Sequence, residues 1–352
     1  MGLVPLAACT ASPAPQAPTP PVVPRPSVPP APSATPTPTA PPTPVWPLTG
    51  LPAPDAASLA HPAVVAKVSN MRESQPQAGI ELADLVVVEP NGINYTRLAA
   101  VFHSQLPERV GPIRSLREGD SKLFGPMKPA MASYGAAQWV LDIIDGNPNI
   151  DNRAVTSAGA ASAYQRDNRR ARPDNAFVDL PVLLQGARAG DAPPALFGYA
   201  ASPEGASAML ASETGAETAT GLRVAYGSGS YAFDYSWDAA SATYLRGTPW
   251  GGAHIAESGV RVAPTNVVVL RIAWSLVDEG GVERTSPVLH ITNTSGDLYA
   301  LTGGRVVRGT WHKGGVNDPF EFTTDSGEPL LLAPGQTYVE LPRADMEVTI
   351  TP

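Results

Sequence analysis

The chain has 352 residues, which is long for a single hydrophobic core and enough for two domains. Hydrophobic residues make up 43% and charged residues 16%, so a folded core is expected, but the 40 prolines are too many to be spread evenly through it. The balance of 24 Lys and Arg against 32 Asp and Glu gives a formal net charge of -8, which argues against nucleic acid as the main partner.

The first nine residues end in a sequence that resembles a bacterial lipobox. Residues 6–9 read Leu-Ala-Ala-Cys, and Cys9 is the only cysteine of the chain. Small residues suit a signal peptidase, and the thiol can accept a diacylglycerol group, so residues 1–9 are interpreted as the remnant of a lipoprotein signal with lipidation at Cys9. No positive charge or apolar stretch precedes the motif, so translation is expected to start upstream of Met1. The alternative is a stray cysteine in a disordered tail.

Residues 10–47 have the composition of a spacer. They contain sixteen prolines, interleaved with Ala, Thr, Ser and Val, and their only charge is Arg25. Such a segment has too few side chains that can bury apolar area, so a disordered linker is expected. In extended polyproline II conformation it reaches on the order of 100 Å, at about 3.1 Å per residue. It is long enough to hold a folded body away from a membrane in which two acyl chains anchor the cysteine.

Residues 48–205 predict a domain that mixes helices and strands. The sequence Ser115-Leu116-Arg117-Glu118 matches a capping box, which predicts a helix that begins there and ends at Gly125-Pro126. A second helix is expected over 136–145, with its apolar residues, including Val140 and Ile143, on one face. Three runs that are rich in apolar residues and bounded by turn residues predict buried strands, at 64–68, 84–89 and 97–102.

Residues 222–352 predict a second domain that consists mainly of strands. Gly303-Gly304 lies between two apolar runs and predicts a hairpin turn. The expected fold class is therefore α+β, with a mixed α/β N-terminal domain followed by a mostly antiparallel β C-terminal domain. The strand-like runs of this part lie at 231–237, 267–272, 288–292, 298–301 and 338–341.

Both predicted domains contain a series of ordered motifs. In the first domain they are Gln75-Pro76-Gln77-Ala78-Gly79-Ile80, Ala83-Asp84, Glu89, Ile93, Thr96-Arg97 and Gly111-Pro112-Ile113-Arg114-Ser115 with Arg117. In the second they are Trp237-Asp238, Thr243-Tyr244, Arg246, Asn266-Val267-Val268-Val269, Gly309-Thr310-Trp311, Lys313 and Pro334-Gly335-Gln336 with Tyr338-Val339. These motifs resemble those of the YerB-like bacterial lipoproteins. The resemblance covers nearly everything from Trp46 to Pro342 and implies an extracytoplasmic lipoprotein of two domains and unknown function. The family pattern usually has a histidine where this chain has Asp174, so the resemblance gives no support for a general base at that position.

A basic region lies within this acidic chain. Residues 97–172 contain eleven Lys or Arg against seven Asp or Glu. Guanidinium groups present a planar fork of donors that suits carboxylates and phosphates. In the alternative interpretation, the same arginines pair with acidic side chains in buried structural networks. The predicted anion-binding residues are Arg97, Arg114, Arg117, Arg166 and Arg170, and their predicted acidic partners are Glu89, Asp120 and Asp167.

No pattern indicates a catalytic set or a metal site. Ser115 is explained by helix capping, and no base stands beside it. The five histidines show no paired spacing, so neither a metal nor a cofactor is expected. Four aromatic residues of the second domain are able to stack on sugar rings of the cell wall, although core packing is their ordinary role. They are Trp237, Tyr244, Trp250 and Trp311.

Two functions remain open from the sequence. The favoured one is a noncatalytic binding or scaffolding lipoprotein of the cell envelope, which is held to the membrane by its lipid and binds a wall component or an envelope protein. The alternative is an enzyme that acts on an anionic wall polymer, with the arginines holding the substrate and Glu89 or Asp120 transferring a proton.

Overall fold

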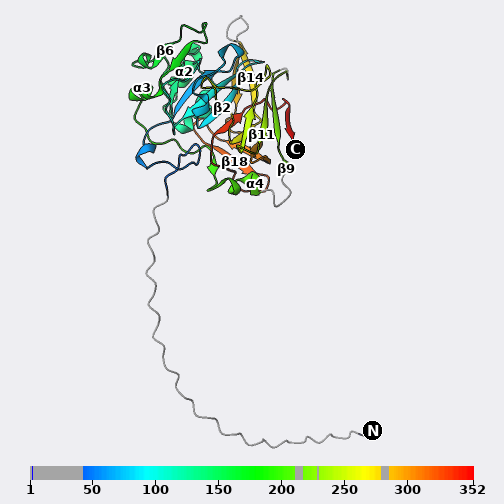
Figure 1. Cartoon of the computed structure of the whole chain (residues 1–352). Coiled ribbons are helices and arrows are strands. Elements are labelled where there is room, and N and C mark those ends of the chain that lie inside the picture. The colour runs from blue at the N-terminus through cyan, green and yellow to red at the C-terminus, as the bar shows by residue number, and fades with distance from the viewer. Residues whose placement is uncertain (1, 3–42, 211–216, 228–229, 279–284) are drawn as a thin grey trace, which may run out of the picture. The chain divides into compact units, whose positions relative to one another are not determined.

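The computed structural model describes Gly2 and residues 43–210, 217–227, 230–278 and 285–352. The predictions for Cys9 and for 10–42 lie outside these residues. Residues 43–352 form one compact unit. Figure 1 shows α2 (Gln138–Asp145), α3 (Leu180–Gln185) and β6 (Tyr164–Arg166) grouped on one side of this body, away from β9 (Glu217–Thr218) and β18 (Phe320–Thr324).

The central element is an eleven-stranded sheet to which both halves of the sequence contribute. Its order is β18-β17-β16-β13-β20-β2-β3-β1-β4-β5, and β9 pairs with β17 beside this path. The first half supplies β1 (Val64–Ser69), β2 (Leu85–Pro90), β3 (Thr96–Phe102), β4 (Ala130–Ala132) and β5 (Asp151–Asn152). The second half supplies β13 (Asn266–Leu270), β16 (Thr294–Thr302), β17 (Arg305–Lys313), β18 and β20 (Thr337–Glu340).

The strand directions change along this sheet. β1, β4 and β5 are parallel, β3 lies antiparallel between β1 and β2, and β2 is parallel to β20, which in turn is parallel to β13. Six strands of the centre therefore share one direction and have their carboxyl ends at the same edge. Beyond β13, the strands β16, β17 and β18 are antiparallel. The predicted fold class, mixed in the first half and mostly antiparallel in the second, is confirmed.

In the described ranges, a second sheet and four short helices cover the two faces of the large sheet. The second sheet has the order β12-β11-β10-β21. Its strands are β10 (Gly221–Tyr226), β11 (Tyr231–Asp238), β12 (Thr243–Arg246) and β21 (Val348–Thr351). The remaining strands form two-stranded pairs: β6 with β7 (Ala176–Val178), β8 (Gly198–Tyr199) with β19 (Leu331–Leu332), and β14 (Ala273–Asp278) with β15 (Thr285–His290). The other α-helices are α1 (Gly119–Phe124) and α4 (Ser207–Leu210).

The core lies in two layers, one on each face of the large sheet. Successive strand residues point to opposite faces, so Val64 and Val65 of β1 belong to different layers. The four-stranded sheet and α3 fill one layer, with side chains such as Phe233, and α1 and α2 fill the other, with Phe124 and Ile144. Because both faces are covered, the central strands read as continuous apolar runs in the sequence.

The predicted strands correspond to observed ones, with ends that differ by a few residues. The hairpin at Gly303-Gly304 is also confirmed: Thr302 pairs with Arg305, and both glycines have positive φ, 59° and 72°. The second predicted helix exists as α2, but Ile143 is exposed while Val140 and Ile144 are buried.

The predicted capping box at Ser115 is wrong. α1 begins at Gly119, and no side chain caps it. The amides of Arg114 and Leu116 instead donate to the carbonyls of Lys67 and Gly135, at 2.7 and 2.9 Å. These backbone bonds hold the stretch against β1 and its neighbours, so it cannot wind into a helical turn.

The body begins before the predicted end of the linker at residue 47. Val45 forms an antiparallel bridge with Pro52, and the amide of Trp46 donates to the carbonyl of Leu51 at 2.8 Å. The indole of Trp46 stands edge-on to the ring of His103, with centroids 5.1 Å apart. His103 also contacts the ring of His61 at 4.6 Å. Trp46 is therefore held at the end of β3, and Val45 beside it pairs with the start of the body.

Candidate functional site

The predicted acids and arginines meet at the carboxyl ends of two parallel strands. Glu89 stands near the end of β2, and Arg97, at the start of antiparallel β3, pairs in register with both Glu89 and Ser69 of β1. In open sheets with parallel strands, ligands bind at the carboxyl ends of the strands. The topology therefore brings these charges to the edge where a site is expected.

The side chains of Lys67, Glu89 and Arg97 lie on the helix-covered face of the sheet. Each is two residues from a member of that core layer, since Val65, Val87 and Ala99 belong to it. The period of two along a strand thus directs three ionisable groups into a buried layer. Burial of a charge is costly unless the charge is paired and hydrogen-bonded.

The pairing is supplied by Lys67, which sequence reasoning missed. Its ammonium Nζ lies 2.6 Å from Glu89 Oε1 and 2.5 Å from Asp120 Oδ1. The side chains of Lys67 and Asp120 are fully buried, and that of Glu89 is 2% exposed. Asp120 comes from α1 and also accepts the amide of Arg117 at 2.6 Å. We call Lys67, Glu89 and Asp120 the buried triad.

The signal that could have revealed Lys67 is present in the sequence. It is the only charged residue in an otherwise apolar strand, Val-Val-Ala-Lys-Val-Ser, whose residues are all buried. A charge at such a position requires a partner of opposite sign. Because 64–68 was predicted as a buried strand, a lysine within it could have been interpreted as one half of a buried ion pair.

Three guanidinium groups lie around the buried triad and repel one another. Burial lowers the pKa of Arg97 well below its ordinary value, and the nearby charges of Arg117 and Arg114 lower it further. Arg97 donates to the carbonyl of Ser115 at 2.7 Å. Burial, together with the neighbouring Asp120, raises the pKa of Glu89 well above its ordinary value, although Lys67 opposes this shift. Both shifts reflect an environment that charged groups enter at a cost.

Arg114 and Arg117 form the partly exposed rim of this cluster. Arg114 pairs with Asp174 at 2.8 Å, and the two side chains are 21% and 12% exposed. The Nε atom of Arg114 has no hydrogen-bond partner within the described part of the chain. Arg117 donates from Nε to the Asn91 side chain and from Nη1 to the carbonyl of Leu116, both at 2.8 Å. We call Lys67, Glu89, Arg97, Arg114, Arg117, Asp120 and Asp174 the charged cluster.

The remaining predicted residues have other partners. Arg166 donates to the Asn175 side chain at 2.7 Å and to the hydroxyl of Tyr134. Arg170 donates to the carbonyls of Ser74 and Pro76, at 3.0 and 2.6 Å. Arg166 and Arg170 were predicted to join Arg97 in one anion site, but their hydrogen bonds go to other groups.

Asp167 belongs to a second, more superficial network. It pairs with Arg109 at 2.9 Å and with Arg169 at 2.8 Å, and Arg109 pairs in turn with Glu257 at 2.7 Å. Arg170 contacts the same Glu257 at 3.5 Å. This network joins β-rich and mixed parts of the body, and Asp167 has no recorded contact with the arginines of the charged cluster.

The aromatic residues of the second half are mainly core residues. Tyr244 and Trp311 are buried, and the rings of Trp237 and Tyr244 pack 5.0 Å apart. Trp311 donates its indole N–H to the carbonyl of Arg271 at 3.1 Å. Stacking of Tyr244 or Trp311 on wall sugars is therefore excluded in this conformation, and Trp250 remains partly exposed.

The described residues contain no group of three or more His, Cys, Asp or Glu side chains arranged to hold a metal ion. None of the helices in the described ranges is long and apolar enough to cross a membrane.

Comparison with known proteins places both halves of the chain. Residues 48–192 match the N-terminal domain of a protein of unknown function, DUF3048, and residues 222–339 match the C-terminal domain of the same proteins. The putative lipoprotein YerB of Bacillus subtilis (strain 168) is 24% identical over 300 residues, which cover 84% of this chain and 85% of the relative. The crystal structure of YerB from Bacillus subtilis has a similar fold, with a TM-score of 0.72 at 21% identity, over 87% of this chain and 99% of that chain. The resemblance noted in the sequence is confirmed.

Proposed function

This chain belongs to the DUF3048 family, and from that premise we propose that it is an extracytoplasmic lipoprotein whose folded body binds an anionic component of the cell envelope. The name of the curated relative, a putative lipoprotein, supports the location. The lipobox that ends at Cys9 and the proline-rich residues after it support the same location. The lipid would hold the chain at the membrane, and the spacer would give the body reach into the envelope.

The location is tested at the N-terminus of the native protein. We expect mass spectrometry of the membrane fraction to find a mature chain that begins at Cys9 and carries a diacylglycerol group. The Cys9→Ala variant is the control, and it should move to the soluble fraction. A native protein whose mature chain begins elsewhere, or whose Cys9 is unmodified in the membrane fraction, would contradict the proposal.

The binding role rests on one observation, the excess of positive charge in the charged cluster. Lys67, Arg97, Arg114 and Arg117 stand against the three carboxylates of Glu89, Asp120 and Asp174. Since the pKa of Glu89 is raised, protonation of Glu89 would increase this excess. An anion bound at the rim would relieve the repulsion that lowers the pKa of Arg97.

The roles within the cluster follow from exposure. Arg114 and Arg117 are partly exposed and present guanidinium forks that suit phosphate or carboxylate oxygens. The buried triad fixes Arg97 and α1 behind them, because Asp120 bonds both Lys67 and the amide of Arg117. The rim would therefore contact the ligand, and the triad would hold the rim in place.

Calorimetric titration with soluble poly(glycerol phosphate) at low salt tests this proposal. We expect Arg117→Gln to weaken binding by about tenfold or more, because a charge-assisted hydrogen bond is lost. Arg223→Gln is the matched control, since Arg223 forms an exposed pair with Asp234 on the second sheet, which covers the opposite face of the large sheet from the charged cluster. Circular dichroism establishes that both variants are folded. Absence of binding by the wild-type protein, or equal loss in both variants, would refute the proposed binding role.

The second candidate function is an enzyme that acts on an anionic wall polymer. It is favoured by the raised pKa of Glu89, because perturbed carboxyl groups beside a charged partner are frequent in active sites. Against it, both Glu89 and Asp120 are buried and engaged by Lys67. Incubation of the polymer with the protein, followed by chromatography, distinguishes the two. Release of fragments that Glu89→Gln abolishes would support the enzyme, and binding without release would support the binding protein.

A further inference from the structure

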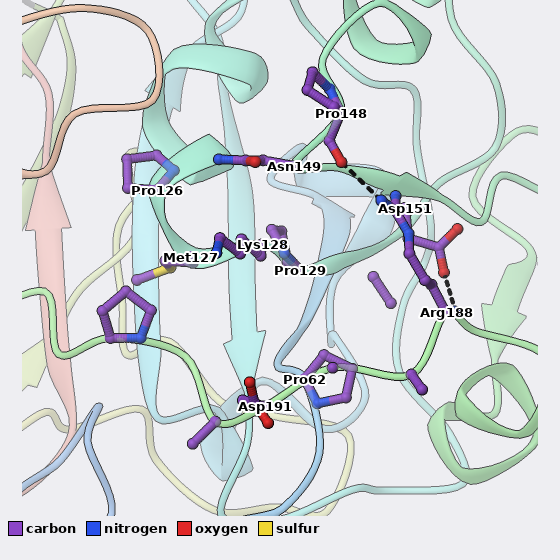
Figure 2. A pocket seen from close by; sticks show the side chains of 15 residues that line it. Pro62, Pro126, Met127, Lys128, Pro129, Pro148, Asn149, Asp151, Arg188 and Asp191 are labelled. Atoms are coloured by element: carbon purple, nitrogen blue, oxygen red, sulfur yellow. Dashed lines mark hydrogen bonds between the residues drawn. The ribbon is translucent and has the colours of Figure 1, made fainter.

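A pocket of about 660 Å³ opens at the amino ends of the parallel strands β1, β4 and β5. Pro62 precedes β1, Pro129 precedes β4 and Asn149 precedes β5, so the pocket lies at the amino ends of these strands. Figure 2 shows these residues around the opening, together with Arg188 and Asp191 from the segment that crosses it. The charged cluster lies at the carboxyl ends, so the two sites are separated by the length of the strands.

The walls of the pocket are rigid. Five of its lining residues are prolines, whose rings fix the backbone and offer apolar surface. Arg188 holds the crossing segment in place: its amide donates to Asp151 at 2.6 Å, and its guanidinium donates to the carbonyls of Pro148 and Ile150, both at 2.7 Å. The contacts of Arg188 with Asp151 and Pro148 are the dashed lines of Figure 2. A pocket built in this way is formed before a ligand arrives.

Lys128, on the wall of this pocket, has an unfavourable backbone conformation. Its φ of 52° and ψ of 50° lie in the left-handed region, which glycine or asparagine usually occupies at such a turn. Lys128 also precedes Pro129, and a residue before proline prefers extended conformations. Strained residues of this kind are concentrated at functional sites, where the side chain is needed. The conformation therefore points to a role for the exposed ammonium group.

Two charges of opposite sign in the pocket have no partner. Neither the ammonium of Lys128 nor the carboxylate of Asp191 makes a hydrogen bond or ion pair with any other residue in the described ranges, whereas Arg188 and Asp151 bond each other. Lys128 comes from the turn before β4 and Asp191 from the segment after Arg188. We infer that this pocket binds a short zwitterionic peptide, whose carboxylate pairs with Lys128 and whose ammonium pairs with Asp191. The proline rings would pack against its side chains.

The test uses alanyl-alanine, in its L,L and D,D forms, as the probe. Titration followed by NMR of the amide groups is compared for the free peptide, the N-acetyl peptide and the peptide amide. We expect the L,L or the D,D peptide with both ends free to bind and to shift the NMR signals of the backbone amides of Lys128 and Asp191. The affinity of the N-acetyl peptide and of the peptide amide should each be lower by about tenfold or more. Lys128→Gly should remove the preference for a free carboxylate, and Asp191→Asn the preference for a free ammonium.

Two controls separate this inference from folding effects and from the anion site. Ala242→Gly is matched to Lys128→Gly, because Ala242 has a φ of 53° and lies outside the pocket. Both glycine variants should leave the Tm unchanged or raise it by up to about 2 °C, and only the one at Lys128 should lose binding. Arg117→Gln should bind the peptide as the wild type does. Failure of both free peptides to bind, equal binding of the capped forms, or unchanged binding by Lys128→Gly would overturn the inference.

Discussion

At the scale of single residues, Lys67 determines how the charged cluster is held. It lies on β1 of the large sheet and binds one carboxylate from β2, on the far side of β3, and one from α1. Without it, Glu89 and Asp120 would be two buried like charges. The lysine thus links the sheet to the helix that positions Arg117.

We predict that Lys67→Ala lowers the free energy of unfolding by about 3–5 kcal/mol, because it leaves buried carboxylates without a counter-charge. Urea denaturation followed by circular dichroism measures this change. Arg223→Ala is the control, and loss of its exposed pair with Asp234 should cost less than about 1 kcal/mol.

A compensated variant separates charge from packing. Lys67→Met combined with Glu89→Gln and Asp120→Asn removes all three charges while keeping similar volumes. It should recover much of the stability that Lys67→Ala loses, since a buried ion pair contributes little beyond matched neutral groups. Equal instability of both variants would show that the ion pairs themselves stabilise the fold and that matched neutral groups do not replace them.

The environment of His103 predicts a pH dependence of stability. Burial and the neighbouring His61 lower the pKa of His103 to about 4, from the ordinary 6.5. Between these values the unfolded chain binds a proton that the folded chain does not, so stability falls as the pH decreases from 6.5 towards 4. We expect a loss of about 1–2 kcal/mol over this range, measured by urea denaturation at several pH values.

The contribution of His103 is isolated by comparison with His103→Gln. The raised pKa of Glu89 acts in the opposite direction, because a proton held by the folded chain favours folding at low pH. That contribution is common to both proteins and cancels in their difference. If the wild type and His103→Gln had the same pH profile, the lowered pKa would not be coupled to folding.

At the scale of elements, strands were predictable and the start of α1 was not. Val-rich runs such as 64–69 owe their structure to burial on both faces, which composition alone indicates. The capping box at Ser115 is a local pattern, and tertiary backbone bonds from Arg114 and Leu116 override it. A short pattern cannot show that its amides have partners far away in the chain.

The same contrast gives a prediction about two capping positions. Asp179 caps α3 and accepts the amide of Val182 at 2.9 Å, whereas the side chain of Ser115 caps no helix. We expect Asp179→Ala to lower the free energy of unfolding by about 1 kcal/mol and Ser115→Ala to change it by less than about 0.5 kcal/mol. Thermal denaturation of the two variants makes the comparison. A larger effect at Ser115 would restore the capping interpretation.

At the scale of the whole molecule, the two family domains share one sheet. β20, near the C-terminus of the chain, lies between β13 and β2 and is parallel to both. A buried network also crosses between the halves, since His254 contacts Gln77 at 2.7 Å. The predicted boundary between 205 and 222 therefore separates sequence regions that do not have separate cores.

We predict that neither half folds alone. Fragments 43–205 and 206–352 should each lack a cooperative thermal transition, because each exposes the sheet edge at β2 or β20. Mixed and refolded together, they should regain one. The control is the full chain with a protease site inserted between Leu210 and Glu217, which should stay folded after cleavage. A well-dispersed NMR spectrum from 43–205 alone would contradict the shared core.

The sequence thus indicated the fold class, but it did not indicate at which edge of the sheet the charges meet. The structure brings Arg114, Arg117, Glu89 and Asp120 into one cluster, but Glu89 and Asp120 pair with Lys67, which the sequence prediction left out. Arg170 was misplaced because its partners, the carbonyls of Ser74 and Pro76, are backbone groups without any sequence signature. Long-range pairing of this kind depends on the complete topology.

The fixed residues 44–53 have a mechanical consequence. Pulling on the chain at Thr43 would load the bridge of Val45 with Pro52 and the ring contact of Trp46 before any strand of the large sheet. An antiparallel pair pulled from one end opens bond by bond, and each opened bond releases slack. The proposed lipid would anchor the chain while the body is held elsewhere in the envelope. Under tension, this loop would then unfold first and lengthen the tether, so that β1 stays in the sheet.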